Sequence, residues 1–202
     1  MRIVGGQYRS RILKSLPGVE IRPTSDRLRE TLFNVLCAGN PQALTGSTWL
    51  DLYAGTGAIG IEALSRGASM VQFVELSQPA NEVIAANLKS LGITSGFKIA
   101  RTQTSRALRQ LDASIKIDYA FLDPPYSEQD EYAKALSLLA ASTALRASSI
   151  VIAEHQKRFD LGEAHANLQR YRILKQGDAA LSFYRKHYDQ VSPNEAIEPP
   201  SL

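Results

Sequence analysis

Residues 49–60 have the sequence WLDLYAGTGAIG, which joins an apolar run of strand length to a glycine-rich turn and the start of a helix. Gly55, Gly57 and Gly60 match the spacing of the glycines in dinucleotide-binding βαβ units. Glu75 ends the next apolar run and stands 20 residues after Gly55, where such units carry an acidic residue for ribose hydroxyls. The pattern therefore predicts a parallel α/β sheet with a ligand site at the glycine turn.

The charge of Asp51 narrows the choice of ligand. Asp51 lies inside the predicted strand, before the first glycine of the turn. Its carboxylate would repel the pyrophosphate of a nicotinamide dinucleotide and attract a cation. S-adenosylmethionine has a positive ammonium and sulfonium, has no pyrophosphate, and offers ribose hydroxyls to Glu75, so the pattern favours it as the cofactor. The alternatives are a solvated Glu75 at a strand end and a tight turn that binds nothing.

A second motif, Asp123-Pro124-Pro125-Tyr126, follows the apolar run at residues 117–122. Ligands of open α/β sheets bind at the edge where parallel strands end. Two prolines fix two φ angles and supply no N–H, which leaves carbonyl groups free in a stiff segment. A carbonyl and the Asp123 carboxylate could accept both hydrogens of an NH2 group, while Tyr126 offers a ring for stacking. The motif thus indicates a clamp for an exocyclic amine; the alternative is a proline-rich turn in which Tyr126 only packs.

These motifs resemble those of the class I S-adenosylmethionine-dependent methyltransferases with a D/N-P-P-Y/F motif. More narrowly, the chain is similar to the bacterial 16S rRNA (guanine-N2)-methyltransferases of the small ribosomal subunit. The narrower likeness rests on three segments: RIVGGQYRSR at residues 2–11, RPTSDRLRETLFN at 22–34 and LSFYR at 181–185. The likeness extends over nearly the whole chain, to about residue 188.

The resemblance implies transfer of a methyl group from S-adenosylmethionine to the N2 amine of a guanine in 16S rRNA, which is either free or in a small-subunit assembly particle. Its catalytic residues would be Asp123, Pro124, Pro125 and Tyr126. The cofactor residues would be Asp51, Tyr53, Gly55, Gly57, Glu75, Gln103, Arg22 and Thr24. Gln103 stands in a segment where the family usually presents an acidic or amide residue to the adenine ring. Arg22 and Thr24 would close over the cofactor from the N-terminal segment.

Strand and helix patterns alternate from about residue 46, which predicts a doubly wound, mostly parallel sheet of seven strands. Residues 171–175 and 180–185 flank a Gly-Asp turn and predict a hairpin, hence a reversed strand at the C-terminal end of the sheet. We therefore divide the chain into a basic N-terminal extension with a capping helix (1–44), a methyltransferase domain (45–188) and a flexible tail (189–202). A small β element is expected within residues 1–16.

The N-terminal extension concentrates positive charge. The chain has a net charge of +3, but residues 1–30 alone carry seven basic and three acidic side chains. Such an arm attracts a polyanion without reading its sequence. Arg2, Arg9 and Arg11 would hold phosphates and Tyr8 would stack on unpaired bases. The alternative is a solvated face of a small hairpin.

Composition excludes several other classes. A single cysteine permits no internal disulfide and no thiolate cluster, and three scattered histidines show no ligand spacing, so no metal is expected. No signal sequence or apolar stretch of membrane length is present, which predicts a cytoplasmic protein, and we expect a monomer. Two other functions remain open. One is methylation of another amine, such as adenine N6 in DNA or RNA or a protein glutamine, and the other is a non-catalytic RNA-binding module.

Overall fold

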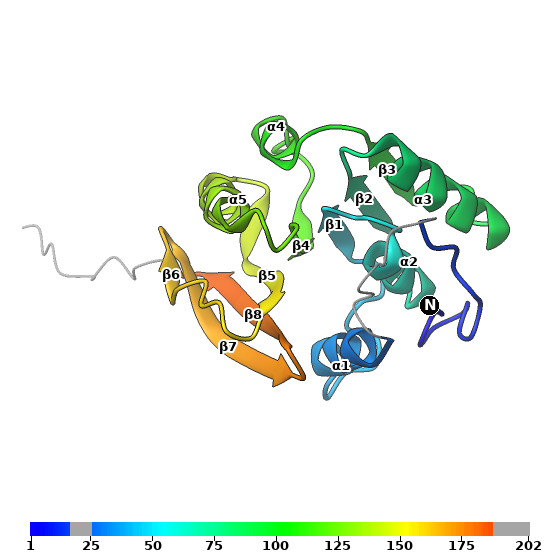
Figure 1. Ribbon diagram of the computed structural model, residues 1–202, viewed down its shortest axis with the longest axis horizontal. Coiled ribbons are helices and arrows are strands. Elements are labelled where there is room, and N and C mark those ends of the chain that lie inside the picture. The colour runs from blue at the N-terminus through cyan, green and yellow to red at the C-terminus, as the bar shows by residue number, and fades with distance from the viewer. Residues whose placement is uncertain (17–25, 188–202) are drawn as a thin grey trace, which may run out of the picture.

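The computed structural model describes residues 1–16 and 26–187, which form one twisted sheet with helices on both faces (Figure 1). Two of the predicted cofactor residues, Arg22 and Thr24, lie outside the described residues, as does the predicted tail at 189–202. The division into an extension, a domain and a tail therefore stays a prediction.

The sheet has eight strands in the order β3-β2-β1-β4-β5-β8-β7-β6. Their bounds are β1 Thr48–Leu52, β2 Met70–Val74, β3 Phe97–Ala100, β4 Ile117–Leu122, β5 Leu145–Gln156, β6 Ala164–His165, β7 Leu168–Gln176 and β8 Ala179–Lys186. Strands β1 to β5 pair in parallel, whereas β8 runs antiparallel to β5 and forms a hairpin with β7. The doubly wound sheet with a reversed C-terminal strand is thus confirmed.

The predicted count of seven strands was wrong by one. The additional strand, β6, is only two residues long and pairs with the beginning of β7. A strand of two residues cannot show alternation, so it exists only through its pairing and leaves no periodic signal in the sequence. Strand β5 begins at Leu145, which pairs with Ile117 ahead of an irregularity in the register.

Five helices cover the two faces of the sheet, within the part of the chain that the structure describes (Figure 1). Helices α1 (Asp26–Leu36), α2 (Ala58–Ser65) and α3 (Gln78–Ser90) pack with Trp49 and Phe73 in one core cluster. Helices α4 (Thr104–Arg109) and α5 (Gln129–Ala141) pack with Leu50 and Leu52 in another. Because side chains alternate along a strand, one strand supplies both cores.

The N-terminal segment, residues 1–16, crosses α2 and α3, and its predicted β element is reduced to one antiparallel bridge between Arg2 and Ile12. Gly6 has a φ of 74°, and a Cβ there would lie 1.9 Å from the carbonyl oxygen of Ser65 at the end of α2. Asn87 of α3 accepts a hydrogen bond from the N–H of Lys14 (2.7 Å) and donates to the carbonyl of Thr56 in the glycine turn (3.1 Å). The segment is therefore tied to the turn that begins α2.

A buried ion network fixes the same segment to α1 and α2. The guanidinium of Arg29 is fully buried, lies 2.8 Å from an oxygen of Asp26 and donates to the carbonyl of Arg2. The buried carboxylate of Glu62 accepts from the N–H of Val4 (2.8 Å) and from Nε of Arg66 (2.8 Å). Removing one member would leave a buried charge uncompensated, which costs about 3–5 kcal/mol. The N-terminal segment is therefore part of the folded unit.

Candidate active site

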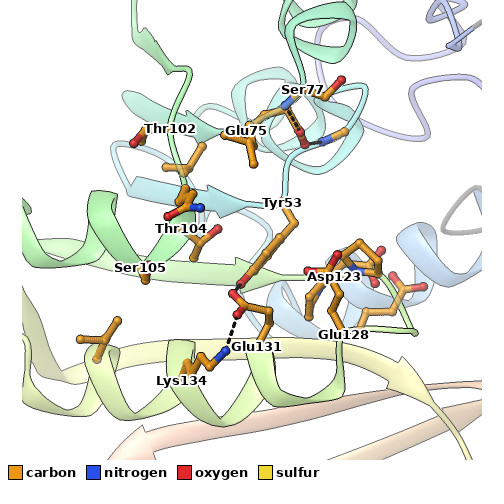
Figure 2. A pocket seen from close by; sticks show the side chains of 18 of the residues that line it. Tyr53, Glu75, Ser77, Thr102, Thr104, Ser105, Asp123, Glu128, Glu131 and Lys134 are labelled. Atoms are coloured by element: carbon orange, nitrogen blue, oxygen red, sulfur yellow. Dashed lines mark hydrogen bonds and ion pairs between the residues drawn. The ribbon is translucent and has the colours of Figure 1, made fainter.

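A cavity of about 1000 Å³ opens where the parallel strands end, at the edge where open α/β sheets bind their ligands (Figure 2). The residues that the sequence predicted for the two halves of the site meet in its lining. They are Tyr53, Gly55, Glu75, Gln103, Asp123, Pro124, Pro125 and Tyr126. The volume is at the upper end of the range for small-molecule sites, and such a cavity could hold a nucleoside-sized cofactor together with a base.

Glu75 is held in place by backbone donors on both sides. One carboxylate oxygen accepts from the N–H of Gly55 (2.9 Å) and the other from the N–H of Ser77 (2.8 Å). Each oxygen retains a further lone pair, so the carboxylate can still accept from two vicinal hydroxyls. Ser77 also caps α3, where its side chain accepts from the N–H of Ala80. An acceptor fixed at this position suits the ribose of a nucleoside.

Asp51 and Gly57 are not in the cavity lining. Asp51 is 2% exposed, and one of its carboxylate oxygens accepts from the N–H of Gly60 (2.9 Å) in the first turn of α2. Burial, opposed by the Gly60 hydrogen bond and assisted by the charge of Glu75, raises the pKa of Asp51 to about 8. Gly57 precedes α2 with a φ of 77°. Both residues support the turn, and their contact with a cofactor stays a prediction.

Tyr53 links the end of β1 to α5. Its φ is 58°, a left-handed conformation that is uncommon for a residue with a side chain. Figure 2 shows its ring extended toward Glu131, to which the hydroxyl donates (2.9 Å), with Lys134 on the same carboxylate (2.9 Å). Burial raises the pKa of the Tyr53 hydroxyl, and the bonds from Lys134 and Tyr53 lower the pKa of Glu131. Sequence reasoning missed Glu131 and Lys134, because charged residues on a helix carry no motif.

Asp123 follows β4 and faces a second acidic residue in the cavity. Burial raises the pKa of Asp123 well above its usual range, and the charges of Glu154 and Asp51 add to the shift. Glu154 lies on β5, is 5% exposed and lines the same cavity. It was missed because it belongs to a run of strand residues without a recognisable pattern. The parallel register of β4 and β5 is the signal that places it beside Asp123.

The family assignment follows from comparison with known proteins. A family model described as conserved hypothetical protein 95 matches residues 1–185. The chain belongs to this family. It is 34% identical over 190 residues to the ribosomal RNA small subunit methyltransferase D of Haemophilus influenzae, with 92% of each chain covered. It is 30% identical over 187 residues to the protein of the same name from Escherichia coli, covering 92% of this chain and 90% of that one.

Solved structures of related proteins have the same fold as this family member. Escherichia coli yhhF, described as a candidate methyltransferase, has a TM-score of 0.80 at 28% identity. The match covers 92% of this chain and 97% of that one. A more distant structure, SMU.776 in complex with SAH, has a TM-score of 0.62 at 15% identity, covering 82% of this chain and 50% of that one. The second likeness concerns the fold alone. The predicted resemblance to 16S rRNA methyltransferases is confirmed by the named relatives.

Gln103 lines the cavity at the residue before α4, together with the hydroxyl-bearing side chains of Thr102, Thr104 and Ser105. Its side chain makes no capping bond to α4. An amide and several hydroxyls at this wall can hydrogen-bond a purine edge. Its contact with the adenine of a cofactor stays a prediction.

The four residues predicted to bind RNA lie on the N-terminal segment, away from the cavity. Arg2, Arg9 and Arg11 are exposed, whereas Tyr8 is half-buried against the core. Arg11 donates to the carbonyl of Ser90 (3.1 Å) at the last residue of α3, and the N–H of Tyr8 donates to Oγ of Ser65 (3.0 Å) at the end of α2. Arg9 and Arg11 therefore lie near the C-terminal ends of α2 and α3, and these ends are the ones farther from the cavity. RNA binding by these residues stays a prediction.

Among residues 1–16 and 26–187, no group of three or more His, Cys, Asp or Glu side chains is arranged to hold a metal ion. In the same residues, no helix combines the length and apolar character needed to cross a membrane.

Proposed function

We propose that this protein transfers a methyl group from S-adenosylmethionine to the exocyclic N2 amine of a guanine in 16S rRNA. The observation that carries the proposal is that Glu75 and the Asp123–Tyr126 motif line one cavity, so that a ribose acceptor and an amine clamp face the same space. The relatives named ribosomal RNA small subunit methyltransferase D support rRNA as the substrate. The methyltransferase description of Escherichia coli yhhF, at 28% identity, supports a methyl donor as the cofactor.

When bound, S-adenosylmethionine supplies a methyl group on a sulfonium, which is already a good leaving group. The protein therefore has mainly to align the attacking nitrogen with the S–CH3 bond. The cofactor would keep the electron pair of its S–C bond as the methyl group passes to nitrogen, so the transfer would need no further reactant. Glu75 and Gly55 would fix the nucleoside end, while Tyr126 would stack on the extruded base.

Asp123 acts on the amine. Guanine N2 is a poor nucleophile because its lone pair is delocalised into the ring. Hydrogen bonds from its two N–H groups to Asp123 and to the carbonyl of Pro124 favour a pyramidal nitrogen and oppose the positive charge that develops on it. After transfer, one proton leaves N2, either to Asp123 or to a water molecule.

Mass spectrometry of rRNA nucleosides tests the proposal. A strain that lacks the gene should lose a stoichiometric amount of N2-methylguanosine from 16S rRNA. The wild-type gene should restore it and Asp123→Ala should not, whereas Asp178→Ala, in the exposed β7–β8 turn, is the control and should restore it fully. Loss of N6-methyladenosine instead, or of no rRNA nucleoside, would refute the assignment. Labelling of purified free 16S rRNA and of assembly particles then separates the two substrate forms.

A further inference from the structure

Glu154 and Asp123 are brought together by the register of two neighbouring strands. Leu122 of β4 pairs in parallel with Ala153 of β5, so that the next residues along the two strands are Asp123 and Glu154. Neighbouring strands lie about 4.8 Å apart, and residues at equivalent register positions point to the same face. Both residues line the cavity. Two carboxylates thus stand side by side at its inner wall.

The position of Glu154 is fixed by its surroundings. Its side chain is only 5% exposed, and its main-chain carbonyl accepts a hydrogen bond from the buried hydroxyl of Tyr132 on α5 (2.8 Å). Burial raises the pKa of Asp123, and the charge of the neighbouring Glu154 adds to the shift. A carboxylate that lines a cavity can accept hydrogen bonds from adjacent donors of a ligand.

The edge of guanine offers two such donors. Guanine presents N1–H beside the N2 amine, whereas adenine presents an unprotonated N1, which is an acceptor, beside its N6 amine. An ionised carboxylate only accepts hydrogen bonds. It therefore binds the N1–H of guanine and repels the N1 lone pair of adenine. Enzymes that extrude a base read it through this Watson–Crick edge.

We infer that Glu154 forms a guanine-recognition subsite: its carboxylate accepts N1–H of the extruded base while Asp123 accepts a hydrogen from N2. This deepens the proposed function and rests on it. The motif around Asp123 binds an exocyclic amine of any base, because it contacts only the amine and a ring face. Glu154 reads the neighbouring ring atom, and this contact selects guanine. A charge-assisted bond of this kind changes affinity by about 10- to 100-fold.

The test uses an RNA that contains the methylated guanosine and a second RNA with 2-aminopurine at that position. 2-Aminopurine keeps the amine at C2 but has an acceptor at N1. With the wild-type protein, kcat/KM for 2-aminopurine should be about 100-fold lower than for guanosine. Glu154→Gln should lower kcat/KM for guanosine about 10- to 100-fold and narrow the guanosine to 2-aminopurine ratio at least tenfold, because an amide can donate to N1. Glu128→Gln, another carboxylate of the cavity lining, is the control and should leave that ratio unchanged.

A purely structural role for Glu154 predicts a different result. Glu154→Gln would then lower both rates equally or shift the thermal midpoint, and the ratio would stay as in the wild type. That outcome overturns the inference and leaves the proposed function intact. Failure of the wild-type protein to methylate the guanosine RNA would instead refute the proposed function itself. Calorimetric affinity for S-adenosylhomocysteine should be the same in the wild type and Glu154→Gln, which shows that the variant is folded around its cavity.

Discussion

Replacing Asp51 with Asn should change how the stability of this protein depends on pH. The Asp51 carboxyl is buried in the strand before the glycine turn, and burial raises its pKa from 3.8 to about 8. In the unfolded chain the group ionises near its ordinary value, so between these two values the folded protein holds one more proton than the unfolded one. The stability that Asp51 contributes is therefore present at low pH and is lost as the pH rises toward 8.

The size of this effect follows from the two pKa values. Each pH unit between them removes about 1.4 kcal/mol, and from pH 5 to pH 7 the loss comes to about 2.5 kcal/mol. Asn cannot ionise, but its side-chain oxygen can still accept from the N–H of Gly60. The free energy of unfolding of the wild type, minus that of Asp51→Asn, should therefore fall by about 2.5 kcal/mol between pH 5 and pH 7.

Urea unfolding followed by the fluorescence of Trp49 measures this difference, because Trp49 is the single tryptophan and is fully buried. Asp112→Asn is the control. A hydrogen bond from Ser114 lowers the pKa of exposed Asp112, so this group is ionised in both states above pH 5 and the substitution should add no pH dependence. If the difference for Asp51→Asn stays constant within about 0.5 kcal/mol from pH 5 to 7, Asp51 is ionised in the folded protein and the reasoning from its burial is wrong.

Three further predictions concern binding and chemistry. Calorimetry should detect binding of S-adenosylmethionine or its demethylated product and no binding of NAD; tight binding of NAD would contradict the cofactor assignment. Asp123→Ala should lower kcat about 10²- to 10³-fold in single-turnover assays while cofactor affinity changes little, and near-normal turnover would place the chemistry elsewhere. Replacing Arg9 and Arg11 with Ala should weaken RNA binding and reduce the slope of its salt dependence by nearly one unit per lost contact. An unchanged slope with a lower thermal midpoint would assign these arginines to folding.

The fold could be predicted from sequence wherever a local pattern and a tertiary role agree. The apolar run before Asp123 and the glycine turn after Leu52 both appear where expected, since buried parallel strands and tight βα turns need those residue types whatever surrounds them. Helix α5 likewise buries apolar residues at helical spacing, among them Tyr132, Leu136 and Leu139. Strand β6 was not predictable, because two residues in a sheet are defined by their partner and not by their own pattern.

The site divides in the same way. The site residues that could be found from the sequence are those with a special backbone requirement. They include Gly55, which has a positive φ in the turn, and the two prolines after Asp123, which have a fixed φ and no N–H. The sequence could not locate Glu154, whose role depends on the register between β4 and β5. Nor did it anticipate that Asp51 would be covered by α2 and bonded to Gly60, because burial of a strand residue depends on the packing of elements that are distant in the sequence.

The proposed phosphate contact at Arg11 and the proposed base site in the cavity lie at opposite ends of α3, so they should affect different kinetic constants. Ser77 caps α3 at the cavity, whereas Arg11 binds the last residue of the same helix. A helix of 13 residues is about 20 Å long. An RNA strand that reaches both sites therefore needs several nucleotides between the phosphate bound by Arg11 and the base in the cavity. A contact at that distance has the same strength before and during methyl transfer, because it is too far from N2 to interact with the charge that develops there. Loss of Arg9 and Arg11 should therefore raise KM for RNA and leave kcat unchanged, whereas loss of Asp123 should lower kcat.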